Sequence, residues 1–386
     1  MIPYSRQSID NKDIKEVIKT LKSDYLTSGP KNLEFENLTK KFLKAKYCVS
    51  LNNASSALLA ACHSLGLEKG DIFWTVPNSF VASANCGILC GAKVDFVDID
   101  YETNNISIPK LRNKLSYAKK NKILPKIIIP VHLGGYPYDQ KELWKLSKKY
   151  NFKILEDASH AFGSTYKGKK VGSCKWSDIT VFSFHPVKVI TTAEGGLIST
   201  NNKRYFDKIL LIKNNGLTRN SKKFLSKETK KYYYEQHSIG YNFRMNEIQS
   251  TLGISQLKKI HLFHKKRIKI AKYYQRMFKK KLPNLILPDN KYFKNSSHHL
   301  YIIKLNTKIS VSRDELILWL KKNGVASNVH YMPIHLQPFF KSKGFKKGEF
   351  INSEKYGENA LSIPMYPDLK LKDQKKIVNL IIKKLR

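Results

Sequence analysis

The chain of 386 residues carries 70 Lys and Arg against 30 Asp and Glu, a formal net charge of +40, and 41% of its residues are hydrophobic. This length exceeds one ordinary hydrophobic core and this hydrophobic fraction excludes an intrinsically disordered chain, so we expect two folded domains. The basic residues are spread along the sequence without a nucleic-acid-binding motif, so we interpret the charge as a lysine-rich, solvated surface and expect no nucleic-acid partner.

Two further features concern the compartment of the protein. No apolar run approaches the roughly 20 residues that span a bilayer, and the opening MIPYSRQSIDNKD lacks the charged and apolar parts of a signal peptide. The five cysteines are an odd number without a C-x-x-C pair, and Cys86 with Cys90 is a poor metal site. We therefore expect reduced thiols, no metal, no membrane insertion and a cytoplasmic location.

The predicted elements begin with helices at residues 13–22 and, after a turn, within 27–43. From residue 47 to residue 200, apolar and β-branched runs alternate with helical stretches, which indicates a mostly parallel sheet covered by helices on both faces. These runs are YCVSLNN, DIFWTVPNSF, KVDFVDID, KIIIPVHLGG, FKILEDAS, DITVFSF and GGLIST.

The pattern changes after the sheet. Residues 246–278 predict one long helix, and a strand at 298–305 and a helix at 312–324 follow it. We therefore expect an α/β fold with a large domain over residues 1–254, built on a mostly parallel sheet, and a smaller C-terminal α/β domain over residues 255–386.

Ligands of such sheets bind beyond the carboxyl ends of the strands, where several polar residues fall. After the first strand, Ser55 and Ser56 open a helix, and their hydroxyl and N–H groups could form a phosphate cup. Plain capping of that helix by Asn53 or Ser55 explains this stretch equally well. After FKIL come Glu156 and Asp157, and the carboxylate of Asp157 could pair with a cationic ring nitrogen. By itself, an acidic pair of this kind is more often the start of a helix.

Lys188 lies in the apolar, threonine-containing stretch SFHPVKVITTAEGG, which Ser183 opens. A lysine that loses water in such surroundings also loses part of its preference for the charged form, so its amine can form an imine with a carbonyl. The alternative is a lysine that merely extends its charge to the surface. A phosphate cup, a carboxylate and an amine in this order are the parts that pyridoxal phosphate requires, and Phe80 could stack on its ring.

The segments NNASSALLAA, PNSFVASANC, EDASHAFGS, FSFHPVKVITTAEGG and YNFRMNEIQSTLG together resemble those of the DegT-type nucleotide-sugar aminotransferases, over essentially the whole chain. The resemblance implies the type I fold of pyridoxal-phosphate enzymes and a homodimer with shared active sites. It also implies a role for each matching residue. Lys188 holds the cofactor and is catalytic, Asp157 pairs with the ring nitrogen, His160 and Phe80 lie against the ring, Ser55, Ser56 and Ser183 bind the phosphate, and Asn242 reaches the phosphate from the other subunit.

Within this family, FSFHPVK, ITTAEGG and IPYSRQSID most resemble the branch that aminates UDP-2-acetamido-2,6-dideoxy-β-L-arabino-hex-4-ulose with L-glutamate in pseudaminic acid synthesis. Arg244, Arg219 and His330 are candidates for binding the UDP-sugar. Val189 and Ser159 depart from the common pattern and leave open another keto sugar, of the 4-amino-arabinose, bacillosamine or perosamine type. A sugar dehydratase of this fold has histidine in place of Lys188, and a non-enzymatic regulator could lose both Lys188 and Asp157.

Overall fold

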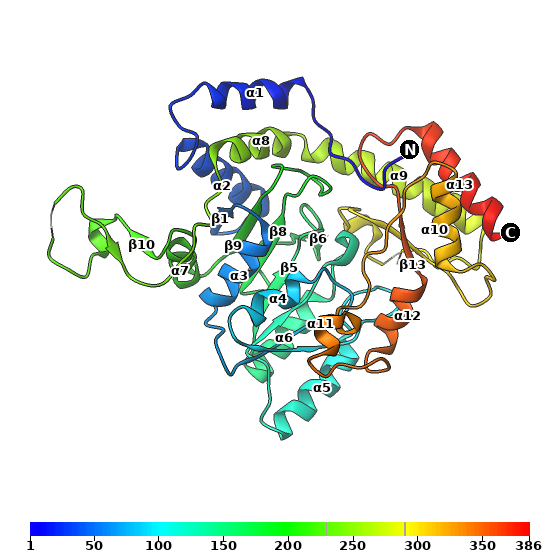
Figure 1. Cartoon of the computed structure of the whole chain (residues 1–386), viewed down its shortest axis with the longest axis horizontal. Coiled ribbons are helices and arrows are strands. Elements are labelled where there is room, and N and C mark those ends of the chain that lie inside the picture. Colours follow the sequence, from blue (N-terminus) through cyan, green and yellow to red (C-terminus); the bar gives the residue numbers. More distant parts are fainter. Residues whose placement is uncertain (229, 289–290) are drawn as a thin grey trace.

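The computed structural model describes residues 1–228, 230–288 and 291–386 (Figure 1). Within these residues the central sheet has seven strands in the order β1-β9-β8-β5-β4-β2-β3. The strands are β1 (Tyr47–Leu51), β2 (Ile72–Thr75), β3 (Lys93–Phe96), β4 (Ile127–Ile129), β5 (Lys153–Asp157), β8 (Ile179–Ser183) and β9 (Gly196–Thr200). Neighbours from β8 to β3 pair in parallel, whereas β9 runs antiparallel to both β1 and β8. The predicted mostly parallel sheet is confirmed.

Helices cover both faces of this sheet, as the continuous apolar runs predict. On β4, Ile127 and Ile129 pack into one buried cluster and Ile128 into another, because successive side chains of a strand point to opposite faces. The first cluster lies under α3 (Ala54–Ser64), α4 (Ala82–Ile88) and α7 (Lys203–Lys213), and the second under α5 (Ile108–Lys120) and α6 (Gln140–Tyr150). The result is the three-layer α/β architecture expected from the sequence.

Three helices pack together over the β1 edge of the sheet: α1 (Asn11–Leu21), α2 (Pro30–Leu43) and α8 (Glu247–Lys258) (Figure 1). Helix α2 has no side-chain cap of its own, and Glu247 supplies the missing acceptor across a large separation in sequence. Its carboxylate accepts hydrogen bonds from the N–H groups of Lys31 (2.7 Å) and Asn32 (3.1 Å). A carboxylate at a helix N-terminus also interacts favourably with the helix dipole, so this contact fixes α2 against α8.

The C-terminal part of the chain has a hydrophobic cluster of its own. The elements of this part of the chain are α9 (Ile260–Lys281), β12 (Tyr301–Lys304), α10 (Arg313–Lys322), α11 (Pro338–Lys341), α12 (Ile351–Asn359), β13 (Ala360–Ile363) and α13 (Leu371–Leu385). The cluster joins α9, α10, α13 and the β12–β13 pair around fully buried side chains such as Tyr274, Tyr301 and Leu316. A separate core of this kind supports two domains.

The boundary between the two parts differs in detail from the expectation. The single helix predicted over 246–278 is two helices that meet at Lys259, and Ser255 lies within α8, which packs on α1 and α2. The first residues of the chain also join the C-terminal part, since Ile2 forms a parallel bridge with Val325. The division at residue 254 therefore stays a proposal, and the structure adds that the N-terminus crosses it.

Short elements complete the fold. They are β6 (Thr165–Tyr166) and β7 (Lys169–Lys170), β10 (Leu217–Thr218) and β11 (Glu235–Gln236), and the 3₁₀ turns at Leu133–Gly135, Ser221–Lys223, Phe293–Asn295 and Ile334–Leu336. The β10–β11 hairpin extends away from the body of the molecule, on the side opposite α10 and α13 (Figure 1). All five cysteines are free thiols. In the part of the chain that the structure describes, no helix has the length and apolar character needed to cross a membrane.

Candidate active site

A cavity of about 590 Å³ lies beyond the carboxyl ends of β5 and β8. This is the place at which a doubly wound sheet offers its strand ends to a ligand. Of the residues singled out from the sequence, the cavity is lined by Ser55, Phe80, Asp157, His160, Ser183, Lys188 and His330. Segments far apart in the chain therefore meet at one site, although Ser56 and Asn242 of the predicted cofactor set do not line it.

Asp157 is the last residue of β5, and two donors hold its buried carboxylate. The hydroxyl of Ser83 donates to Oδ2 at 2.6 Å, and the backbone N–H of Ser159 donates to Oδ1 at 3.0 Å. The hydroxyl of Ser79 lies 2.8 Å from that of Ser83 and extends the chain of hydrogen bonds. These contacts fix the carboxylate in one orientation in a site of low polarity, where a paired cation is held strongly. Sequence reasoning missed Ser83 and Ser79.

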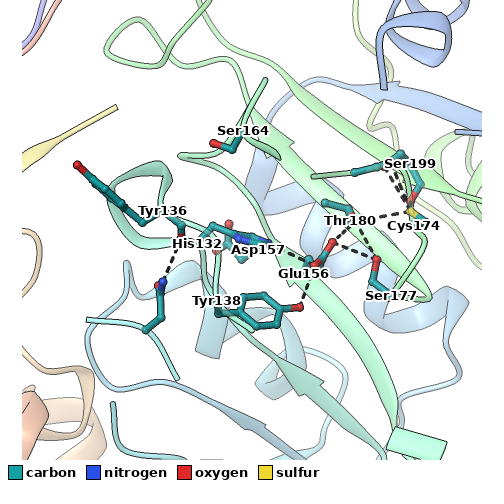
Figure 2. A network of polar contacts seen from close by, with 12 residues as sticks. His132, Tyr136, Tyr138, Glu156, Asp157, Ser164, Cys174, Ser177, Thr180 and Ser199 are labelled. Atoms are coloured by element: carbon teal, nitrogen blue, oxygen red, sulfur yellow. Dashed lines mark hydrogen bonds and ion pairs between the residues drawn. The ribbon is translucent and has the colours of Figure 1, made fainter. Parts of the chain in front are cut away.

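A second carboxylate lies directly behind Asp157. Glu156 points to the opposite face of β5 and is buried without a lysine or arginine partner among the described residues (Figure 2). Its acceptors are satisfied by Tyr138 Oη (2.8 Å), Thr180 Oγ1 (2.6 Å), Ser177 Oγ (3.0 Å) and His132 Nε2 (3.3 Å). These groups hold the pKa of Glu156 below its ordinary value although burial acts to raise it. The network anchors the end of β5 and thereby the position of Asp157.

Lys188 lies in the connection between the antiparallel strands β8 and β9. The flanking Val189 and Ile190 are buried and hold this connection against the core, and the hydroxyl of Ser5, near the N-terminus, donates to the carbonyl of Val187 at 3.0 Å. Burial lowers the pKa of Lys188 to about 8, and the negative charge of Asp157 acts in the opposite direction. The amine is thus available as a nucleophile and base much nearer to neutral pH than an ordinary lysine.

The histidines around Lys188 are held neutral. The pKa of each is lowered mainly by burial and to a smaller extent by the charge of Lys188. For His330 the pKa falls to about 3, and the pKa of His160 is also well below its ordinary value. The backbone N–H of Gly134 donates to His160 Nδ1 at 3.2 Å, so the proton of the neutral ring is on Nε2, which lies 3.2 Å from the hydroxyl of Tyr331. His330 therefore lines the cavity as a hydrogen-bonding group and not as a cation for a diphosphate.

The first turn of α3 meets the cavity at Ser55. Asn53 caps the helix, because its Oδ1 accepts the backbone N–H of Ser56 at 2.8 Å. The capping interpretation left open by the sequence is thus correct for Asn53, and it occupies the N–H of Ser56, which does not line the cavity. The turn remains directed at the site with the positive end of its dipole, which suits an anion beside Ser55.

The structure does not bring Asn242, Arg244 and Arg219 to this cavity within one chain. Arg244 donates from Nη1 to Asn214 Oδ1 at 2.8 Å, and the backbone of Asn242 bridges that of Asn214. Arg244 and Arg219 line a second cavity of about 430 Å³ between α2, α7 and the start of the β10–β11 hairpin. Within one chain, neither arginine therefore lines the Lys188 cavity.

The residues at the main cavity fit pyridoxal phosphate. An amine with a lowered pKa suits its aldehyde, a fixed carboxylate suits its ring nitrogen, and the first turn of α3 with Ser183 suits its phosphate. The ring of Phe80 is half-exposed at the cavity and lies 5.9 Å from that of Tyr331. Among the described residues, no group of three or more His, Cys, Asp or Glu is arranged to hold a metal ion.

Comparison with known proteins gives a consistent result. A model of the DegT/DnrJ/EryC1/StrS aminotransferase family matches residues 7–382. The UDP-4-amino-4,6-dideoxy-N-acetyl-beta-L-altrosamine transaminase of Campylobacter jejuni is 38% identical over 379 residues, covering 97% of this chain and 95% of that protein. The structure is similar to that of Helicobacter pylori PseC, an aminotransferase of pseudaminic acid biosynthesis, with a TM-score of 0.89 and 33% identity over 100% and 99% of the two chains. The structure is also similar to that of a putative sugar aminotransferase of Streptococcus pneumoniae in its PLP form, with a TM-score of 0.87 and 28% sequence identity, covering 100% of this chain and 99% of that chain.

Proposed function

The chain belongs to the DegT/DnrJ/EryC1/StrS aminotransferase family and is a pyridoxal-phosphate-dependent sugar aminotransferase, and we propose that it aminates C4 of UDP-2-acetamido-2,6-dideoxy-β-L-arabino-hex-4-ulose with L-glutamate as amine donor. The observation that carries this proposal is the meeting of Lys188 and Asp157 in one cavity, in a chain related over nearly its whole length to a transaminase of the corresponding amino sugar. The product is the UDP-linked 4-amino-4,6-dideoxy sugar of the pseudaminic acid pathway.

Each residue of the cavity has a role in holding the cofactor. When bound, pyridoxal phosphate supplies an aldehyde that carries the amino group and a ring that accepts electrons. Lys188 binds it covalently through Nζ, and Asp157, fixed by Ser83, holds the ring nitrogen protonated. The hydroxyls of Ser55 and Ser183 and the first turn of α3 bind the phosphate, whereas Ser56, whose N–H donates to Asn53, does not line the cavity.

Lys188 also moves the proton. Once its amine is free, Nζ would remove the proton from the carbon that bears the amino group of the donor in the first half reaction. In the second half reaction it would deliver a proton to C4 of the sugar, which becomes saturated. Efficient transfer in both directions requires a group whose pKa lies near the working pH. The pKa of about 8 meets this requirement, whereas an ordinary lysine would stay protonated.

The proposed enzyme is a homodimer in which the partner completes each site. Asn242 of the partner subunit binds the phosphate, and Arg219 and Arg244 neutralise the diphosphate of the UDP-sugar. Two facts support this division. None of the three residues lines the Lys188 cavity of its own chain, and with His330 neutral that lining contains no lysine or arginine besides Lys188, which holds the cofactor. His330, with Nδ1 2.9 Å from the hydroxyl of Ser362, contributes a hydrogen bond to the sugar.

The test is incubation of the cofactor-loaded protein with glutamate and UDP-2-acetamido-2,6-dideoxy-β-L-arabino-hex-4-ulose, followed by mass and NMR analysis of the sugar. We expect a 4-amino product, formed by the protein and by Lys170→Ala, which removes a partly buried lysine outside the cavity, but not by Lys188→Ala. A protein that takes up the cofactor and responds to glutamate but leaves this sugar unchanged would direct the search to another keto sugar.

A further inference from the structure

A groove of about 640 Å³ lies between α9 and the segment that leads into α13. It shares no lining residue with the Lys188 cavity. Its floor is apolar, formed by side chains such as Ile270, Tyr273 and Leu371, the last of which is more than half exposed. Its rim is basic, formed by Lys266, Lys269, Lys272, Arg276 and Lys375, and no acidic residue lines it. We call this feature the α9–α13 groove.

The charge of the groove continues along both helices. Helix α9 contains nine lysines and arginines and no acidic residue in 22 positions, and α13 contains five lysines and one aspartate. Only Arg267 among the cations of α9 is buried. One acidic neighbour compensates part of this charge, since Asp368 lies 2.8 Å from Lys266. The remaining rim cations face solvent, so the positive face extends well beyond the groove itself.

This combination identifies the chemistry of a partner. Nucleic acid would use the basic rim but not the apolar floor, because its outer surface is phosphate and sugar. An acidic amphipathic helix would fill the groove but would leave unused the cations that continue to the ends of α9 and α13, such as Lys279 and Lys383. An anionic lipid surface uses both features, since lysines and arginines near such a surface are attracted to the headgroups while apolar side chains enter the interface.

We propose that the α9–α13 groove and the basic faces of its two helices form a docking surface for an anionic bilayer. The protein lies on the membrane and does not cross it, in agreement with the absence of a membrane-spanning helix among the described residues. The docking end of the molecule, with α10 and α13, lies opposite the β10–β11 hairpin (Figure 1). Docking therefore leaves the hairpin and the second cavity at its base accessible to another copy of the chain.

The experiment is co-sedimentation of the cofactor-loaded protein with two kinds of vesicle, pure phosphatidylcholine and phosphatidylcholine mixed with phosphatidylglycerol. The test variant carries Lys269→Gln, Lys272→Gln, Arg276→Gln and Lys375→Gln. The control variant carries Lys119→Gln, Lys120→Gln, Lys122→Gln and Lys141→Gln, four exposed lysines on or near α5 and α6, so both variants lose the same net charge. Thermal melts and cofactor absorbance verify that both variants are folded.

We expect binding to the anionic vesicles alone, weakening as salt is added. Each basic residue near an anionic surface contributes about a fivefold factor in affinity, so the loss of four should weaken binding of the test variant by about 600-fold at low salt. The control variant should bind nearly as the unaltered protein does. Leu371→Ser should weaken vesicle binding severalfold without changing its dependence on salt, because it removes apolar contact and no charge.

Three results would overturn the proposal. Equal loss in the test and control variants would mean that net charge alone attracts the protein. Equal binding to both kinds of vesicle would remove the electrostatic argument. Binding of an acidic amphipathic peptide that depends on the groove, without binding to vesicles, would assign the groove to a protein partner instead.

Discussion

Covalent capture of pyridoxal phosphate by Lys188 should depend on pH with a midpoint near 8. Only the neutral amine reacts with an aldehyde, and the pKa of about 8 results from burial of the amine, opposed by the charge of Asp157. At pH 7 roughly one tenth of such an amine is neutral, compared with about 0.03% of an ordinary lysine, a difference of roughly 300-fold. The buried site thus accounts for a large part of the selectivity of the cofactor for this lysine over the many exposed ones.

The measurement is the rate of the absorbance change when apo-protein is mixed with pyridoxal phosphate between pH 6 and pH 10.5. Reaction of the cofactor with a free lysine derivative over the same pH series corrects for the titration of the cofactor itself. Asp157→Asn tests the cause of the midpoint: loss of the negative charge lowers the pKa of Lys188 further, so the midpoint should move to lower pH. The affinity of this variant for the cofactor should fall at the same time, because the ring nitrogen loses its partner.

Two outcomes would refute this reasoning. A midpoint close to 10.5 in the unaltered protein would mean that water solvates the amine and that the apolar surroundings of Lys188 have no electrostatic effect. A midpoint that moves to higher pH in Asp157→Asn would mean that Asp157 does not act on the lysine through its charge. Lys170→Ala, outside the cavity, should leave the midpoint unchanged.

Three further predictions concern the residues that support the site. Ser83→Ala should weaken cofactor affinity about tenfold or more in an equilibrium titration, because a hydrogen bond to a carboxylate contributes about 1.5–3 kcal/mol. The control Ser64→Ala, which removes a buried serine hydrogen bond elsewhere, should leave the affinity unchanged, and equal losses in the two variants would contradict a role of Ser83 in holding Asp157. Glu156→Gln should lower the free energy of unfolding by about 2–3 kcal/mol at neutral pH. Because the pKa of Glu156 is lowered in the folded state, this loss of stability should be complete above pH 4.5 and should shrink as the pH falls through the lowered pKa. A difference in denaturant midpoint that does not depend on pH would contradict the ionised network. Gly196→Ala would place a Cβ 2.3 Å from the carbonyl oxygen of Asn53, so it should displace the start of α3 and weaken cofactor binding, and unchanged affinity would show that the phosphate does not depend on that turn.

The features that follow from local sequence were predictable. Continuous apolar runs between helical stretches predict a parallel sheet because each strand is buried on both faces, and Ile127, Ile128 and Ile129 show this directly. Lys188 was recognisable because it is a single cation in an apolar stretch at a strand end. Its local surroundings therefore carried the signal of its chemistry.

Features that depend on contacts distant in sequence were not predictable from the residues alone. Ser83 reaches Asp157 across 74 positions, and nothing in PNSFVASAN distinguishes its hydroxyl from that of Ser79. The break at Lys259 interrupts a helical pattern that is continuous in the sequence. The neutrality of His330 arises from burial beside Lys188, which only the folded chain creates.

The central claim is that Lys188 is the residue that holds the cofactor, and peptide mapping tests it most directly. The protein is loaded with pyridoxal phosphate, the bond is made permanent with borohydride, and the modified peptide is identified by mass spectrometry. We expect the label on the peptide that contains Lys188, unchanged in Lys170→Ala and absent in Lys188→Ala. A label on a different lysine, or uptake undiminished in Lys188→Ala, would contradict the account.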